Sequence, residues 1–161
     1  MTAASWVQRE AERRREQERM QQQKSAARLD RVKKTADKAP ALWEKFAAVL
    51  ENHVAEFNQL FRDDKQRLFE VEKPAPRTLL LKRSPYPSLR MEIFLNVDTR
   101  SVNWQVVRTP RAHAKSSEEI GALPIALDEK GSPQLMNGSK PMTPEAASEL
   151  ILKPVLFPSD K

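Results

Sequence analysis

The chain of 161 residues contains no cysteine and only three glycines. Without cysteine it can form neither a disulfide bond nor a thiolate nucleophile or metal ligand, and this composition fits a reducing compartment. The few glycines form no phosphate-binding loop, and the serine nucleophile motif G-x-S-x-G is also missing. We therefore expect a protein that is not an enzyme and that uses no cofactor.

Long apolar segments are missing as well. No run approaches the roughly 18 apolar residues that a membrane-spanning helix needs. The N-terminal segment lacks the apolar region of a secretory signal, and its four early glutamates are unlike an organelle transit peptide, which is poor in acids. We expect a soluble, cytoplasmic protein with no membrane partner.

Positive charge is concentrated near the N-terminus. The formal net charge of the chain is +6, and residues 1–40 hold eleven basic and six acidic side chains, a net charge of +5. Helix-forming residues dominate the segment 5–38, with glutamates three or four positions before arginines, but its few large apolar residues make no heptad seam. We predict that residues 1–39 form a charged extension, a fraying and partly disordered helix that ends at Pro40.

The segment 41–62 has the apolar spacing of an amphipathic helix with one wide buried face. Burial of each large side chain on such a face contributes about 1.5–3 kcal/mol. The residues that define this face are Leu42, Trp43, Phe46, Val49, Leu50, Val54, Phe57, Leu60 and Phe61.

Four or five short segments between residues 77 and 137 have the character of β-strands. In 89–97 apolar and polar residues alternate, which is typical of a strand with one buried face. Gly121 and Pro124 favour a bulge or a sheet edge within 120–127. Turn sequences between the segments predict an antiparallel meander. The expected strands are 77–83, 89–97, 102–107, 120–127 and a short one around 133–136.

The last predicted element is a helix that begins after Thr143. Thr143 is suited to the N-cap and Pro144 to the first helical position, whereas Pro154 is expected to end or kink the helix. We predict an α+β domain over residues 40–161, in which an N-terminal helix, a meander of four or five strands and a C-terminal helix pack together. A barrel-like sheet capped by the C-terminal helix is the alternative.

His53 is the candidate for a ligand pocket. It lies on the apolar face of the helix 41–62, where the ordinary interpretation is a histidine at the edge of the core with one hydrogen-bond partner. The alternative is a ligand or base in a pocket between the helix and the sheet. His113, sixty residues away, makes only a weak case for zinc with it, and we expect no metal.

Two groups of basic residues are candidates for binding an anionic partner. Such groups can contact phosphates and give salt-sensitive binding to nucleic acid without sequence preference. Glutamates interleave with the first group, so we favour a solvated or protein-docking helix over a nucleic-acid interface there. Arg83 and Arg90 would extend the second group only if the fold brings them near it. The groups are Arg13, Arg14 and Arg15 in the extension, and Arg108, Arg111 and Lys115 in a predicted loop over 108–119.

These observations favour a small non-enzymatic protein that binds another macromolecule, with its N-terminal helix as the docking element. One alternative is a nucleic-acid-binding accessory protein that uses residues 9–38, with the loop 108–115 as a second contact. The other is a carrier of a small ligand, with its pocket near His53.

Overall fold

The computed structural model describes residues 5–158. The chain divides into two compact units, residues 1–34 and residues 35–161. In the first unit residues 6–34 are helical and no described side chain is buried. They belong to α1 (Trp6–Leu60), which continues into the second unit. The described residues of the first unit therefore form a solvated helix.

Helix α1 passes through Pro40 and does not end there, so the predicted end of the helix is wrong. A proline inside a helix removes one hydrogen bond and costs about 3 kcal/mol. Burial on both sides of Pro40 offsets this cost, because Ala39 is fully buried and Trp43 is only 3% exposed. The apolar face predicted for 41–62 thus begins earlier, at Thr35, and most of its predicted members are buried. The buried residues of α1 are Thr35, Ala39, Leu42, Trp43, Phe46, Ala47, Leu50, Val54 and Phe57.

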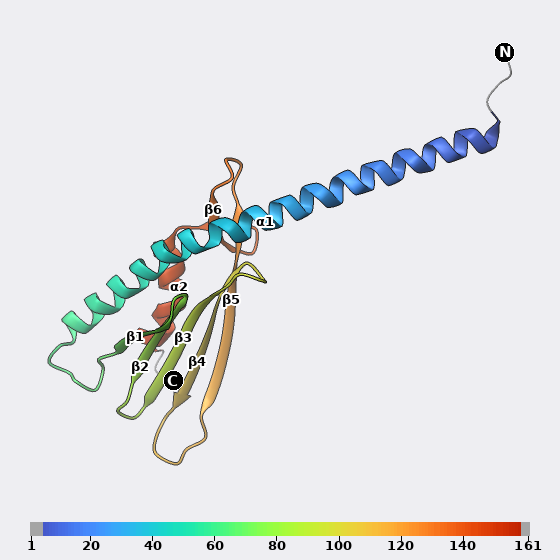
Figure 1. Ribbon diagram of the computed structural model, residues 1–161. Helices are drawn as coiled ribbons and strands as arrows, with labels where there is room; N and C mark the ends of the chain where they lie inside the picture. Colours follow the sequence, from blue (N-terminus) through green and yellow to red (C-terminus); the bar gives the residue numbers. More distant parts are fainter. Residues whose placement is uncertain (1–4, 159–161) are drawn as a thin grey trace. The chain divides into compact units, whose positions relative to one another are not determined.

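Seven antiparallel strands follow α1 and pair in chain order, so that β1 and β7 are the edges of an open sheet (Figure 1). The predicted α+β class and meander are confirmed, whereas the predicted number of strands was too low and the sheet does not close into a barrel. The strands are β1 (Glu70–Ala75), β2 (Thr78–Arg83), β3 (Ser88–Asn96), β4 (Ser101–Thr109), β5 (Ser117–Leu127), β6 (Pro133–Asn137) and β7 (Lys140–Met142).

The two edge strands are the ones that the sequence did not predict. Every residue of β1 is exposed, so the strand shows no alternation of apolar and polar residues, and it contains Pro74. Strand β7 has only three residues and contains Pro141. Both prolines are tolerated because an edge strand needs fewer backbone donors.

Strand β5 has one partner strand along most of its length, so the predicted sheet edge is present at residues 117–124, whereas the alternative of a bulge is wrong. It pairs with β4 without a register shift up to Pro124, and residues 125–127 then pair with β6. Pro124 therefore stands where the strand changes partner. The presence of a glycine at position 121 has a different explanation. Gly121 pairs with Trp104 of β4, and the Trp104 ring occupies the space that a side chain at this position would need.

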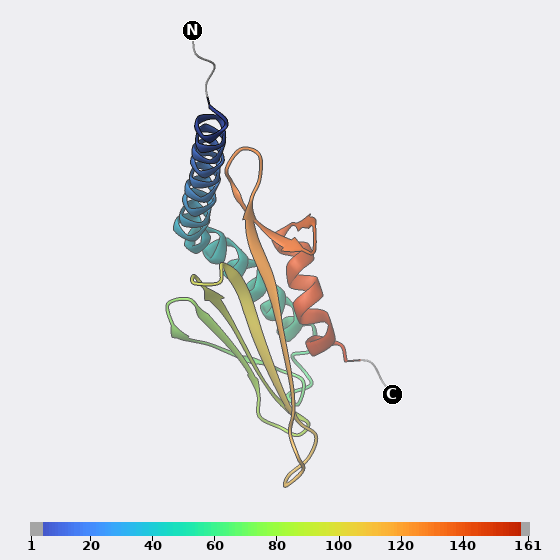
Figure 2. The ribbon, with the colours of Figure 1, turned by 90° about the vertical axis from the view of Figure 1, so that its right-hand side faces the viewer.

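Helices α1 and α2 (Pro144–Leu156) pack on the same face of the sheet, and Figure 2 shows α2 beside the second half of α1. The alternating residues of β3 face them, as predicted: Met91 and Ile93 are fully buried. Thr143 caps α2, since its hydroxyl accepts a hydrogen bond from the Ala146 amide at 3.1 Å. Pro154 does not end α2, which continues to Leu156. Among the described residues, no helix is long and apolar enough to cross a membrane.

Candidate functional site

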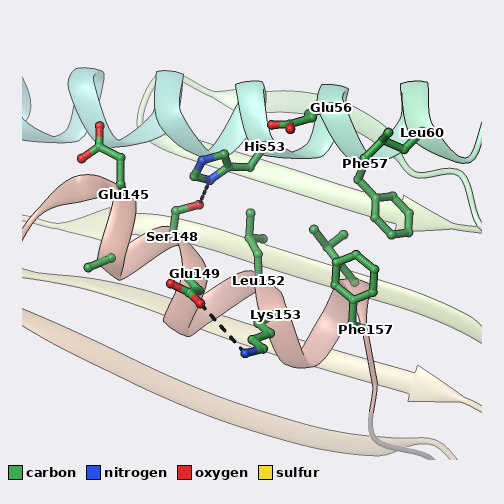
Figure 3. A pocket seen from close by; sticks show the side chains of 12 residues that line it. His53, Glu56, Phe57, Leu60, Glu145, Ser148, Glu149, Leu152, Lys153 and Phe157 are labelled. Carbon is green, nitrogen blue, oxygen red and sulfur yellow. Dashed lines mark hydrogen bonds and ion pairs between the residues drawn. The ribbon is translucent and has the colours of Figure 1, made fainter.

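A groove of about 610 Å³ lies between α1 and α2 (Figure 3). Residues 53–60 of α1 form one wall, and residues 145–157 form the other. The walls come together because both helices turn an apolar face to the same sheet, which leaves their facing flanks side by side. The groove is therefore a direct consequence of the fold.

A hydrogen bond between His53 and Ser148 joins the two walls. The Nδ1 atom of His53 lies 2.6 Å from the Ser148 hydroxyl. Ser148 is fully buried and His53 is half-buried. Among the described residues His53 thus has one side-chain partner, and it lines a groove between two helices instead of a pocket between helix and sheet. Its place on the apolar helix face was the signal that singled it out.

The floor of the groove is apolar and is partly open to solvent. Phe57 and Leu152 are buried beneath it, whereas Leu60 is 72% exposed and Phe157 is 55% exposed. The Phe57 and Phe157 rings pack edge to face, with centroids 5.4 Å apart. The groove therefore offers a structured apolar surface and not a few loose side chains.

Acidic side chains stand on the rim of the groove. Glu56 comes from α1, and Glu145 and Glu149 come from α2 (Figure 3). Lys153 lies 3.9 Å from Glu149, in a solvent-exposed pair that contributes little to stability. Among residues 5–158, neither Glu56 nor Glu145 forms a salt bridge. The rim thus carries a net negative charge.

The sequence predicted none of the three glutamates, nor Ser148, as site residues. Ser148 is 95 positions from His53, and only the packing of the two helices makes them neighbours. The sequence held one indication that Ser148 is a site residue, which is that this serine lies between Ala147 and Ile151 on the apolar face of the C-terminal helix.

The arginines of the extension lie on the exposed surface of α1. Glu10 accepts a hydrogen bond from Arg13 at 2.7 Å and one from Arg14 at 3.3 Å. These two bonds lower the pKa of the Glu10 carboxyl. Arg15 is exposed on the same helix. Part of the positive charge predicted to bind an anionic partner is therefore balanced within the helix.

The second basic group does not form a single loop cluster, which corrects the prediction. Arg108 belongs to β4, and its guanidinium donates a hydrogen bond to the Pro154 carbonyl of α2 at 3.2 Å. Arg111 and Lys115 lie in the loop 110–116 and are exposed. The prediction placed them together because it ended the strand too early.

Arg83 lies near Arg108, whereas Arg90 does not. Arg83 of β2 pairs with Leu89 of β3, and Leu89 pairs with Arg108 of β4. Paired residues lie on the same face of a sheet, so both arginines face the helices. Arg90 follows Leu89 and is therefore on the opposite face.

No three histidine, aspartate or glutamate side chains in the range 5–158 are grouped to hold a metal ion. Comparison with family models, with curated proteins and with solved structures finds no match to this chain.

Proposed function

We propose that this protein is a protein-binding module whose groove between α1 and α2 receives an amphipathic, basic helix of its partner. The observation that carries the proposal is the combination of an apolar floor with an acidic rim. The cysteine-free composition supports our expectation that the protein acts in the cytoplasm.

The dimensions of the groove suit a helix. The wall on α2 runs from Glu145 to Phe157, which at a rise of 1.5 Å per residue is about 18 Å. A partner helix of three to four turns matches this length. Such a helix presents apolar residues at i, i+3, i+4 and i+7, the pattern by which helices dock in apolar grooves.

The apolar floor supplies the affinity. Leu60 and Phe157 are large apolar side chains that the described structure leaves mostly in water. Covering one such side chain fully contributes about 1.5–3 kcal/mol. Contiguous exposed apolar surface with a polar rim is typical of an interaction site.

The acidic rim selects the partner by charge. Glu56 and Glu145 stand on opposite walls, so a helix in the groove meets a carboxylate on each side. Lysine or arginine beside the apolar stripe of that helix is then favoured, and acidic residues are repelled. The same charges disfavour nucleic acid at this site, because its phosphates carry negative charge.

Two designed peptides of about four helical turns test the proposal. They share one apolar stripe and differ only in the polar face, which carries lysine in one and glutamate in the other. We expect the lysine peptide to shift the amide resonances of residues 53–60 and 145–157, with at least tenfold higher affinity than the glutamate peptide. Absence of binding by both peptides would contradict the proposal.

Charge reversal on the rim provides the matched comparison. The double variant Glu56→Lys/Glu145→Lys should invert the preference between the two peptides. Glu129→Lys makes the same kind of change in the exposed turn between β5 and β6, away from the groove, and should leave the preference unchanged. Binding of a small apolar compound without either peptide would instead favour a ligand carrier.

A further inference from the structure

A second cavity, of about 460 Å³, lies at the other side of Phe157 from the groove. Its lining includes Arg67, Arg83 and Tyr86, and Phe157 contributes to both cavities. The lining of this cavity is basic, in contrast to the acidic rim of the groove. The two sites therefore differ in the charge of the ligand that they can accept.

The sheet register places a third arginine, Arg108, on the same face of the sheet as Arg83. Arg83 and Arg108 flank Leu89 in one row across β2, β3 and β4. Their backbones are two strand spacings apart, about 10 Å. Long side chains on the same face at this separation can reach a common region, and Arg108 extends toward the end of α2.

Aromatic rings hold two of the guanidinium groups in place. The guanidinium carbon of Arg83 lies over the Phe69 ring, 5.2 Å from its centroid, and that of Arg67 lies over the Phe61 ring at 5.0 Å. The Nε of Arg83 also donates to the Pro87 carbonyl at 3.1 Å. A guanidinium held against a ring loses less freedom when its remaining N–H groups bind a ligand.

The arginines lack sufficient counter-charge within the described residues. Asp64 is the acid that lines the cavity there, and it already pairs with Arg67 at 2.9 Å. Arg83 forms no salt bridge in residues 5–158. Glu119 lies 4.0 Å from Arg108, but the Nε of Arg108 is buried and has no hydrogen-bond partner in the part of the chain that the structure describes.

The environment of Arg83 opposes its positive charge. Burial lowers the pKa of Arg83, and the nearby charges of Arg108 and Arg67 lower it further. A bound anion would relieve this repulsion and would supply acceptors to the free N–H groups.

We propose that this cavity binds the phosphate group of a small phosphate ester, with Arg83 and Arg67 as its ligands and Arg108 adding positive charge from the same face of the sheet. Guanidinium groups bind phosphate through paired N–H donors, which makes arginine the preferred residue for this recognition. Tyr86 is 54% exposed at the cavity and is placed to contact the group that carries the phosphate. The site shares Phe57, Leu156 and Phe157 with the proposed helix-binding groove, but its arginines do not line that groove.

Titration of the full chain with phenyl phosphate, at constant ionic strength, tests the assignment. We expect saturable shifts of the Arg67 and Arg83 Nε–H resonances, and Arg83→Gln should weaken binding at least tenfold. Arg90→Gln removes an equal charge from the opposite face of the sheet and should leave the affinity unchanged. Inorganic phosphate is the second probe: a similar affinity identifies free phosphate as a sufficient ligand, and a weaker one identifies an ester.

Several results would overturn the proposal. They are shifts that do not saturate, equal affinity in Arg83→Gln and Arg90→Gln, or benzoate binding as tightly as phenyl phosphate. If Arg83→Gln does not fold, Arg67→Gln takes its place, because Arg67 is mostly exposed and its loss leaves the core intact. Arg83→Lys keeps the charge but loses the paired donors, and it too should weaken binding.

Discussion

The His53 ring on α1 and the Ser148 hydroxyl on α2 lie 2.6 Å apart and join the two helices across the groove. Ser148→Ala removes this hydrogen bond, and we expect the free energy of unfolding to fall by about 1 kcal/mol. Denaturant titration measures the change. Ser139→Ala, in the exposed turn before β7, is the control and should have no effect. Equal stability of the two variants would show that the bond does not hold the helices together.

Gly121 is required because the Trp104 ring covers it. A Cβ atom at this position would come within 2.8 Å of the indole Nε1 and closer still to the ring carbons. Gly121→Ala should therefore destabilise the domain by about 1–3 kcal/mol, the usual cost of overpacking. In a Trp104→Leu background the same change should cost far less, and a double-mutant cycle measures the difference. Equal costs in both backgrounds would refute the steric explanation.

Pro40 lies inside α1, and its replacement should stabilise the protein. Pro40→Ala restores a backbone N–H within a continuous helix, so we expect a gain of about 1–3 kcal/mol in the free energy of unfolding. Pro110→Ala, in the exposed loop after β4, should give no such gain. A neutral or destabilising Pro40→Ala would instead indicate that a helix begins at this residue.

The unit 35–161 should fold without the preceding residues. No described side chain before Thr35 is buried, and the core is drawn from Ala39 onward. A variant that lacks residues 1–34 should unfold cooperatively, with a melting temperature within a few degrees of that of the full chain. A loss of cooperativity, or a much lower melting temperature, would mean that the N-terminal segment contributes to the core.

The sequence predicted those parts of the fold that depend on local patterns. The alternation around Met91 and Ile93, the helical spacing around Phe46 and the cap at Thr143 each reflect a short-range rule, and each is confirmed. The failures have physical causes as well. Pro40 is tolerated because tertiary burial offsets a local penalty, and β1 was missed because an exposed edge strand has no apolar alternation to detect.

The candidate sites were harder to predict because they join distant parts of the chain. His53 was identifiable by itself, but Glu56 and Glu145 become neighbours only when α2 packs beside α1. The proximity of Arg83 to Arg108 likewise depends on the register of three strands. A pattern along one segment contains no information about such pairings.

The most direct test of the account is to locate a basic amphipathic helix on the protein. A lysine-faced peptide with a spin label at one end should broaden the amide resonances of residues 53–60 and 145–157 and spare those near Ile120, which is exposed on the outer face of the sheet. That result would place the peptide in the groove between α1 and α2. Broadening that is strongest on the outer face of the sheet, or no broadening at all, would contradict the claim that the groove is the binding site.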